Sequence, residues 1–292
     1  MAQSKSTVPA SVPRRELAQI LTDLREASGL TLKEIADQVG VDHGHLSRVH
    51  RALRGISEEL LGKLLDLPYA HVATEEERTR AFELLRADLA EEDPYKRHST
   101  LLTPTQYGGY LKFERGASSL RAYELALISG LLQTEEYATA VIEAMRPDLS
   151  KKGVATLVEI RMQRQERLMG GGKAFHVVID EAALRRPVVS AEPMRRQLRR
   201  LVEVAEHPFV SVRFLPMNTG CHAGLYGSFM IMGFPEPTPR VVWVEGLAES
   251  TYFAKQDHVE RYATAFDSLW QRAVPLAADH DFVEKVIKEL PT

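Results

Sequence analysis

The chain has 292 residues, a formal net charge of −3 and 44% hydrophobic residues, enough for a sizeable core and for more than one average domain. It contains no apolar run of ~18 residues and no charged-then-apolar leader, so we expect neither a membrane span nor secretion. Cys221 is the single cysteine, which excludes an internal disulfide framework. These features predict a cytoplasmic protein without a membrane partner or a cofactor.

Apolar residues at helical spacing recur through the N-terminal part of the chain. Leu17, Leu21 and Leu24 predict a helix over residues 14–28. Ser57 and Thr74 are placed to cap two later helices, the second with a capping box. With the two helices described next, these elements predict an all-α domain of five helices.

Residues 29–54 predict two short helices joined by a tight glycine turn. Thr31 and Glu34 form a capping-box signature at the first helix, Gly40 supplies a positive-φ residue at its end, and Asp42 can cap the second helix. This is the pattern of a DNA-binding helix-turn-helix, whose second helix enters the major groove with its N-terminal residues at the base edges.

The exposed face of the second helix carries groups that can donate to bases or phosphates. We assign His43, Gly44 and Ser47 to base readout and the remaining residues to phosphates or groove walls. The predicted DNA-binding set is Thr31, Lys33, His43, Gly44, His45, Ser47, Arg48, Arg51 and Arg54. The alternative is an ordinary helical hairpin with a solvated polar face.

Charge modifies this interpretation. Residues 1–73 hold nine Lys and Arg and nine Asp and Glu, whereas residues 41–55 hold three arginines against Asp42 alone. A neutral domain with one basic face should bind non-specific DNA weakly and depend on two half-sites for its affinity. We therefore expect a homodimer on a palindromic operator in double-stranded DNA.

The sequence GLTLKEIADQVGV followed by LSRV resembles the five-helix DNA-binding domain of Xre-type (Cro and phage-repressor-like) regulators. The sequence departs from that family in two places. Leu32 stands where the family often has a phosphate-binding Gln, and His50-Arg51-Ala52 stands where it often has Glu-Arg-Gly.

Prolines and glycines break the helical pattern over residues 91–110, which we interpret as a linker. The predicted domains are therefore a disordered tail at 1–12, the helix-turn-helix domain at 13–90, the linker, and a C-terminal domain at 111–292. In that last domain the predicted helices are 134–145, 154–168, 193–206, 257–273 and 279–290. The predicted strands are 175–180, 210–216, 227–234 and 240–246. Strands grouped late between helices predict an α+β domain, with a mixed α/β sheet as the alternative.

Four blocks in this part, GLLQTEEYA, DEAALRRPV, CHAGLYGSF and VVWVEGL, resemble the large C-terminal domain of antitoxin-like bacterial regulators. The biochemical function of that domain is largely unassigned. The resemblance implies a small protein partner, because such regulators are often encoded beside one.

Candidate effector or partner residues in the C-terminal domain are Asp180, Glu181, Arg185, Arg186, His222, Tyr226 and Trp243. Asp180, Glu181 and His222 could bind a metal or transfer a proton. A carboxylate that caps a helical turn and a ring that holds a loop are the stronger alternatives. Because no catalytic or metal-binding motif accompanies these residues, we expect no enzyme and no metal site.

Residues 151–200 are basic, with twelve Lys and Arg against five Asp and Glu. They could hold an acidic partner or add a DNA contact. For DNA we favour the alternative of solvated helix faces that pair with acidic flanks.

The sequence therefore predicts a sequence-specific transcriptional regulator, associated with the nucleoid through DNA. Its C-terminal domain would bind a small-molecule effector or a protein partner, or would dimerise. The competing hypothesis is an antitoxin-like protein that sequesters a small partner and uses its helix-turn-helix for autoregulation.

Overall fold

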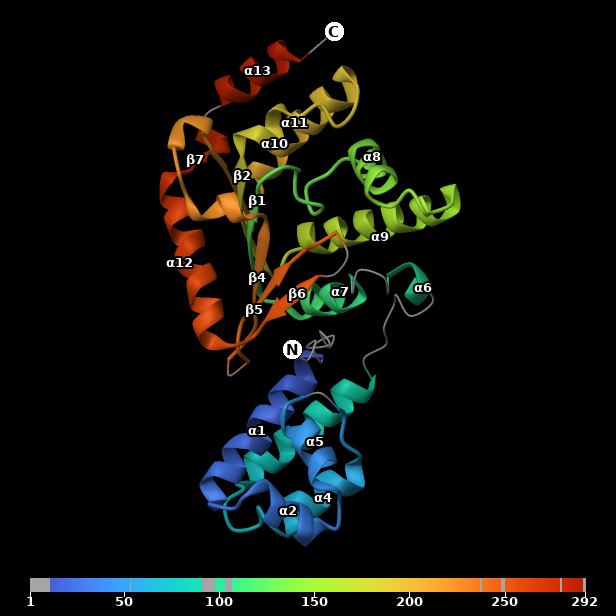
Figure 1. The fold of residues 1–292 in the computed structure, drawn as a ribbon, viewed down its shortest axis with the longest axis vertical. Helices are drawn as coiled ribbons and strands as arrows, with labels where there is room; N and C mark the ends of the chain where they lie inside the picture. The colour runs from blue at the N-terminus through green and yellow to red at the C-terminus, as the bar shows by residue number, and fades with distance from the viewer. Residues whose placement is uncertain are drawn as a thin grey trace, which may run out of the picture. The chain divides into compact units, whose positions relative to one another are not determined.

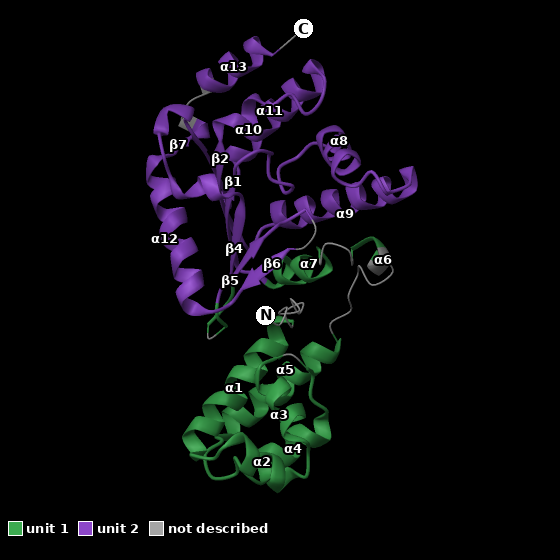
Figure 2. Cartoon of the chain, viewed as in Figure 1, with its two compact units in different colours: residues 1–116, 234–239 green, residues 117–233, 240–292 purple. Residues whose placement is uncertain are grey.

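The computed structural model describes residues 11–52, 54–90, 98–102, 107–236, 238–247, 250–278 and 280–290 (Figure 1). The chain forms two compact units, Met1–Gly116 with Phe234–Pro239, and Ala117–Gly233 with Arg240–Thr292 (Figure 2). Most of the predicted tail and much of the predicted linker lie outside the described residues, and the predicted domain limits stay a prediction.

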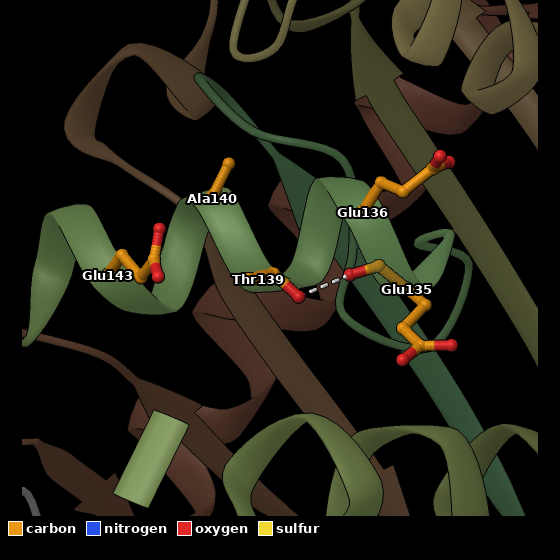
Figure 3. Close-up of a pocket in the computed structure, with 5 residues that line it drawn as sticks. All are labelled: Glu135, Glu136, Thr139, Ala140 and Glu143. Carbon is orange, nitrogen blue, oxygen red and sulfur yellow. Dashed lines mark hydrogen bonds between the residues drawn. The ribbon is translucent and has the colours of Figure 1, made fainter. Parts of the chain in front are cut away.

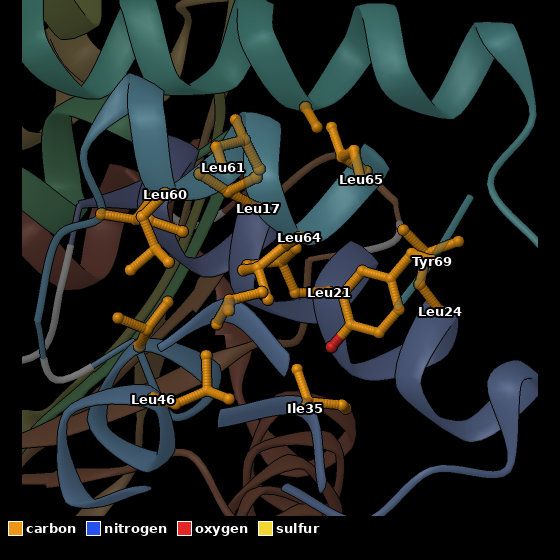
Figure 4. Close-up of a cluster of buried hydrophobic side chains, with 14 of the residues drawn as sticks. Leu17, Leu21, Leu24, Ile35, Leu46, Leu60, Leu61, Leu64, Leu65 and Tyr69 are labelled. Atoms are coloured by element: carbon orange, nitrogen blue, oxygen red, sulfur yellow. The ribbon is translucent and has the colours of Figure 1, made fainter. Parts of the chain in front are cut away.

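The described part of the first unit is helical. Its elements are α1 (Val12–Ser28), α2 (Leu32–Val39), α3 (His43–His50), α4 (Glu58–Asp66), α5 (Glu75–Ala90), α6 (Ser99–Leu102) and α7 (Tyr107–Gly116). Leu21, Ile35, Leu46, Leu61 and Leu64 are completely buried where α1 to α4 meet (Figure 4). The predicted all-α domain of five helices is confirmed in α1 to α5.

Local capping sets the helix ends in this unit. The side chains of Thr31, Asp42 and Ser57 each accept a hydrogen bond from a backbone N–H in the first turn of the helix that follows. Thr74 and Glu77 make the reciprocal contacts of a capping box at the start of α5. Each cap was predicted from the residue type alone, because it needs only residues within three positions of each other.

The second unit is built on a sheet of mixed direction, with strand order β6-β5-β4-β1-β2-β3-β7. The strands are β1 (Ser119–Glu124), β2 (Ala174–Asp180), β3 (Val210–Leu215), β4 (Phe229–Gly233), β5 (Val241–Val244), β6 (Thr251–Phe253) and β7 (Val274–Pro275). β1, β2 and β3 pair in parallel, and the remaining pairs are antiparallel.

Helices surround this sheet. They are α8 (Glu135–Met145), α9 (Lys151–Met169), α10 (Glu181–Arg185), α11 (Ala191–Ala205), α12 (Gln256–Arg272) and α13 (His280–Glu289), with short 3-10 turns at Met217–Thr219, Ala223–Tyr226 and Leu276–Ala278. Figure 1 shows α12 along one face of the sheet and α8, α9 and α11 on the other side. Tyr123, Val178 and Val242 pack from the sheet against Phe266 and Leu269 of α12.

The predicted fold class is confirmed, an all-α region followed by a unit with a mixed sheet and helices. The predicted strands at 175–180, 210–216 and 240–246 match β2, β3 and β5 within a few residues. Three strands, β1, β6 and β7, were not predicted. β6 and β7 have three and two residues, too few for a periodic pattern. Within the described ranges, no helix combines the length and apolar character needed to cross a bilayer.

Buried glutamines order the connection that leaves β1. Gln197 of α11 accepts from the backbone N–H of Thr134 (2.7 Å) and donates to the carbonyl of Leu132 (2.9 Å). Gln165 of α9 donates to the carbonyls of Gly130 and Gln133. These amides satisfy backbone groups that the loop would otherwise bury unpaired.

Replacing Gln197 with Leu should lower the free energy of unfolding by about 2–4 kcal/mol, because two buried backbone groups lose their partners. Urea unfolding of the full chain measures this. Gln163→Leu is the matched control, since Gln163 is exposed on α9 and its side-chain amide donates to exposed Glu159 and not to a buried backbone group. A Gln197→Leu protein with the unfolding midpoint of the control would contradict the role given to Gln197.

Candidate functional site

The two helices α2 and α3 have the geometry predicted for a helix-turn-helix. Gly40 ends α2 with φ +70°, in the left-handed region where a side chain is strained. Val39 of α2 and Leu46 and Val49 of α3 are buried in the same core. Ala36 is 1% exposed, as expected for a small side chain where two helices cross closely. The turn and the core therefore fix which face of α3 is directed outward.

The structure brings the predicted DNA-binding residues together on two consecutive helices and the segment after them. Lys33, His43, Arg48, Arg51 and Arg54 are exposed. Gly44, His45 and Ser47 are half-buried on α3. Thr31 is exposed, but its hydroxyl and its backbone N–H both donate to Glu34 in the capping box, so its first role is structural.

The cations of this surface are available for a ligand. Among the described residues, Lys33, Arg48, Arg51 and Arg54 have no ion-pair partner within 4.0 Å. By contrast, Arg78 and Arg80 of α5 pair with acidic residues. A set of unpaired cations on one side of a helix pair is the local footprint expected of a phosphate-binding surface.

Gly44 leaves little room for a side chain. A Cβ at this position would lie 3.0 Å from a carboxylate oxygen of Asp42 and 3.4 Å from a guanidinium nitrogen of Arg48. The carboxylate is the N-cap of α3, accepting from the backbone N–H of His45 at 2.8 Å. The bare backbone at Gly44 therefore lets the cap and Arg48 coexist at the N-terminus of α3.

The other end of α3 is anchored inward by His50. Its Nε2 lies 3.2 Å from the hydroxyl of Tyr69, which is completely buried. Burial, with a smaller contribution from positively charged Arg25, lowers the pKa of His50 to about 4. The ring is therefore neutral at neutral pH, and it holds α3 to the core.

Ala52 is the residue with positive φ outside glycine in the described chain, at φ +56°. It follows α3 directly, at the position where the resembling family often has Gly. The left-handed region brings the Cβ of an L-residue close to the neighbouring carbonyl oxygen, which costs about 1–2 kcal/mol. Ala52, in the segment that follows α3, therefore has a backbone conformation that its Cβ makes unfavourable.

In the second unit, Asp180 is the centre of a buried polar cluster at the carboxyl ends of β1 and β2. One of its oxygens accepts from the backbone N–H of Ala182 at 3.0 Å, which confirms the predicted cap of α10. The other accepts from the hydroxyl of Tyr123 at 3.0 Å and lies 4.0 Å from Nε2 of His222. Burial lowers the pKa of His222, against the opposing effect of Asp180, so the ring is mainly neutral at neutral pH.

The loop that carries His222 is tied down from several sides. Glu181 accepts from the backbone N–H of Met217 at 2.9 Å and pairs with Arg185 at 2.6 Å. Arg272 of α12 donates to the carbonyls of Thr219 and Cys221. A Cβ at Gly224 would meet the ring of Tyr123 at 2.5 Å, so the loop lies directly on that ring. The loop is therefore held in one conformation.

The remaining candidates do not join this cluster. Tyr226 is fully exposed on the same loop, with Leu225 beside it 56% exposed. Arg186 is exposed after α10. Trp243 lies on β5, where neighbours alternate between faces; its neighbour Val242 faces α12 together with Tyr123, so Trp243 faces the opposite side of the sheet.

Glu124 is a titratable residue that could not be singled out from the sequence. Glu124 ends β1 half-buried, and loss of surrounding water raises its pKa to about 8, with the nearby Glu245 acting in the same direction. Hydrogen bonds from Ser129 and Ser228 oppose this shift. The signal that could have found it, an acidic residue at the end of a buried strand, requires β1 to be recognised first.

An acidic groove runs along α8 (Figure 3). It has a volume of about 580 Å³ and is lined by Glu135, Glu136, Thr139, Ala140 and Glu143. The basic residues of 151–200 neutralise part of this negative charge, since Arg196 pairs with Glu136 at 2.5 Å. Arg195 and Arg200 pair with Glu192 and Glu203. Over the described parts of the chain, no three His, Cys, Asp or Glu side chains gather where they could hold a metal ion.

Comparison with known families gives two matches. The family described as a helix-turn-helix domain matches residues 16–81. The family described as a domain of unknown function (DUF5753) matches residues 107–285, more than half of the chain. The chain belongs to the DUF5753 family. No curated protein matches it.

The two matches cover different parts of the chain, and the first of them indicates a role. The helix-turn-helix match covers α1 from Glu16 onward, α2 to α4, the start of α5 and the predicted DNA-binding residues, and it indicates a DNA-binding regulator. The DUF5753 match covers the whole sheet, including the Asp180 cluster, but assigns it no activity.

Replacing Ala52 with Gly should raise the free energy of unfolding by about 1 kcal/mol, because Gly adopts positive φ without strain. The same replacement at Ala87, exposed in the helix α5, should lower it by about 1 kcal/mol. Thermal unfolding of both variants checks the pair. Equal shifts of the same sign would show that the backbone at residue 52 is unstrained.

Proposed function

We propose that this DUF5753 protein is a sequence-specific transcriptional regulator of the Xre type, which binds a palindromic operator as a homodimer. The observation that carries the proposal is the outward face of α3, with Arg48 and Arg51 exposed and without ion-pair partners in the described chain. His43 and Gly44 begin α3 and Ser47 follows about one turn later, and the N-terminal residues reach base edges when such a helix enters the major groove.

Substitutions at Ser47 and Arg48 distinguish contacts to bases from contacts to phosphates. Arg48→Ala should weaken binding to all DNA sequences by about tenfold and reduce the salt slope by about 1, as expected for one lost phosphate contact. Ser47→Ala should weaken binding to the operator while leaving non-specific binding unchanged. Fluorescence anisotropy with the DNA upstream of the protein's own coding sequence, over a salt series, measures both effects.

Arg86→Ala is the control, because Arg86 is exposed on α5, outside the helix-turn-helix. Its binding should equal that of the wild type. Absence of specific binding by a folded wild-type protein would refute the proposed regulator.

We assign sensing or dimerisation to the second unit. Its support is the ordered loop network at the carboxyl ends of β1 and β2, where Tyr123, Asp180 and His222 meet. Ordered loops above a rigid sheet are a common setting for ligand binding. A ligand or partner that favours one arrangement of the dimer would change the spacing of the two α3 helices. We propose a non-enzymatic role for this unit, in a protein that works at the nucleoid in the cytoplasm.

A second candidate function is an antitoxin-like protein that sequesters a small partner. The favouring observation is the loop at 216–228, which is firmly anchored yet exposes Met217, Leu225 and Tyr226. Aromatic and aliphatic side chains on a rigid support are typical anchors of protein interfaces.

If this surface binds a protein, Leu225→Ser together with Tyr226→Ser should abolish co-purification of a stoichiometric small protein from the native host. Met145→Ser, which alters an exposed hydrophobic residue on α8, should leave the complex intact. Retention by the double variant, or a wild-type protein that purifies alone, would count against the antitoxin-like function.

A further inference from the structure

Arg15, in the first turn of α1, has an unusual environment for a residue of a DNA-binding domain. Its guanidinium carbon lies 5.4 Å from the ring centre of Phe113 and 5.3 Å from that of Phe234. The two rings meet edge to face at 5.9 Å. Nη2 of Arg15 donates to the carbonyl of Pro239 at 2.8 Å. We call these four residues the arginine clamp.

The clamp joins segments that are distant in sequence. Phe113 belongs to α7, and two residues separate the end of α7 from the start of β1. Phe234 and Pro239 belong to the connection between β4 and β5, which is part of the first unit although both strands belong to the second. The connection therefore leaves the sheet, contacts Arg15 within the first unit, and returns to the sheet.

Helix α1 links the clamp to the DNA-binding surface. It packs against both α3 and α5. Its N-terminus is fixed to α5 by Arg14, which pairs with Asp88 at 3.0 Å. A change at the first turn of α1 therefore acts on a helix that contacts α3 directly.

Two polar groups in or beside the clamp lack hydrogen-bond partners within the described part of the chain. Nη1 of Arg15 and the hydroxyl of Thr238 are both buried and, among the described residues, have no hydrogen-bond partner. Burial lowers the pKa of Arg15 to about 10, so the group is still charged at neutral pH and has lost water. Arg15 as a whole is half-buried, and its buried, unmet N–H offsets part of the stabilisation that the two rings supply. We therefore expect the contact to be only marginally stable, so that a modest change in free energy would open it.

We propose that the arginine clamp couples the DNA-binding helices to the sheet of the second unit, with the closed clamp as the state that binds operator DNA. Arg15 acts as a positioning residue and makes no contact with DNA. A signal that moves β4 or β5 reaches α3 through the clamp and α1. The effect on DNA rests on the proposed regulatory function, whereas the coupling itself does not.

Two substitutions in the full-length protein test the clamp, Arg15→Met and Phe234→Leu. Each should weaken operator binding about fivefold in fluorescence anisotropy, because the helices lose preorganisation. The double variant should bind no more weakly than either single variant, since all three open the same contact. Arg86→Met, with the same loss of charge at an exposed site, should bind as the wild type does.

Hydrogen–deuterium exchange of the free proteins gives a readout without DNA. Arg15→Met and Phe234→Leu should each raise exchange in the first turn of α1 and in Phe234–Pro239, and Arg86→Met should not. Additive losses of operator affinity, a salt slope reduced by Arg15→Met beyond that of Arg86→Met, or unchanged exchange would overturn the proposal. If the wild type fails to bind DNA while exchange rises as expected, the clamp stands and the proposed regulator fails.

Discussion

The left-handed turn at Gly40 is the constraint on which the predicted DNA-binding surface depends. It lets α2 end and α3 begin within three residues, with Asp42 capping the second helix. The apolar residues of both helices are then buried in one core, and the polar side of α3 therefore faces solvent. The outward direction of Arg48 is therefore a consequence of backbone geometry and apolar burial.

The first unit could be predicted from sequence because its determinants are local. Caps, glycine termini and apolar spacing act within a few residues, and each of these signals at Thr31, Gly40, Asp42 and Ser57 corresponds to the structure. The strain at Ala52 could not be foreseen from such rules. It follows from how the chain must leave α3, and nothing in the residue type announces a positive φ.

The second unit was less predictable because its decisive contacts join distant residues. β1 is recognisable only through its pairing with β2 and β4, more than fifty residues away. The cluster of Tyr123, Asp180 and His222 depends on that pairing. The cap at Asp180, which needs only residue 182, was foreseen, whereas its bond to Tyr123 was not. The same limit applies to the raised pKa of Glu124.

The path of the β4–β5 connection affects the modularity of the protein. Helix-turn-helix domains are commonly regarded as exchangeable cassettes, cut from one chain and fused to another. Here the first unit is discontinuous, since Phe234–Pro239 belongs to it as much as α1 does. A cut after Gly116 would remove the ring of Phe234 and the carbonyl of Pro239, which face Arg15, and with them the edge-to-face contact between Phe234 and Phe113. A fusion that exchanges the first unit should therefore also exchange the β4–β5 connection. The two compact units do not correspond to two continuous segments of the sequence.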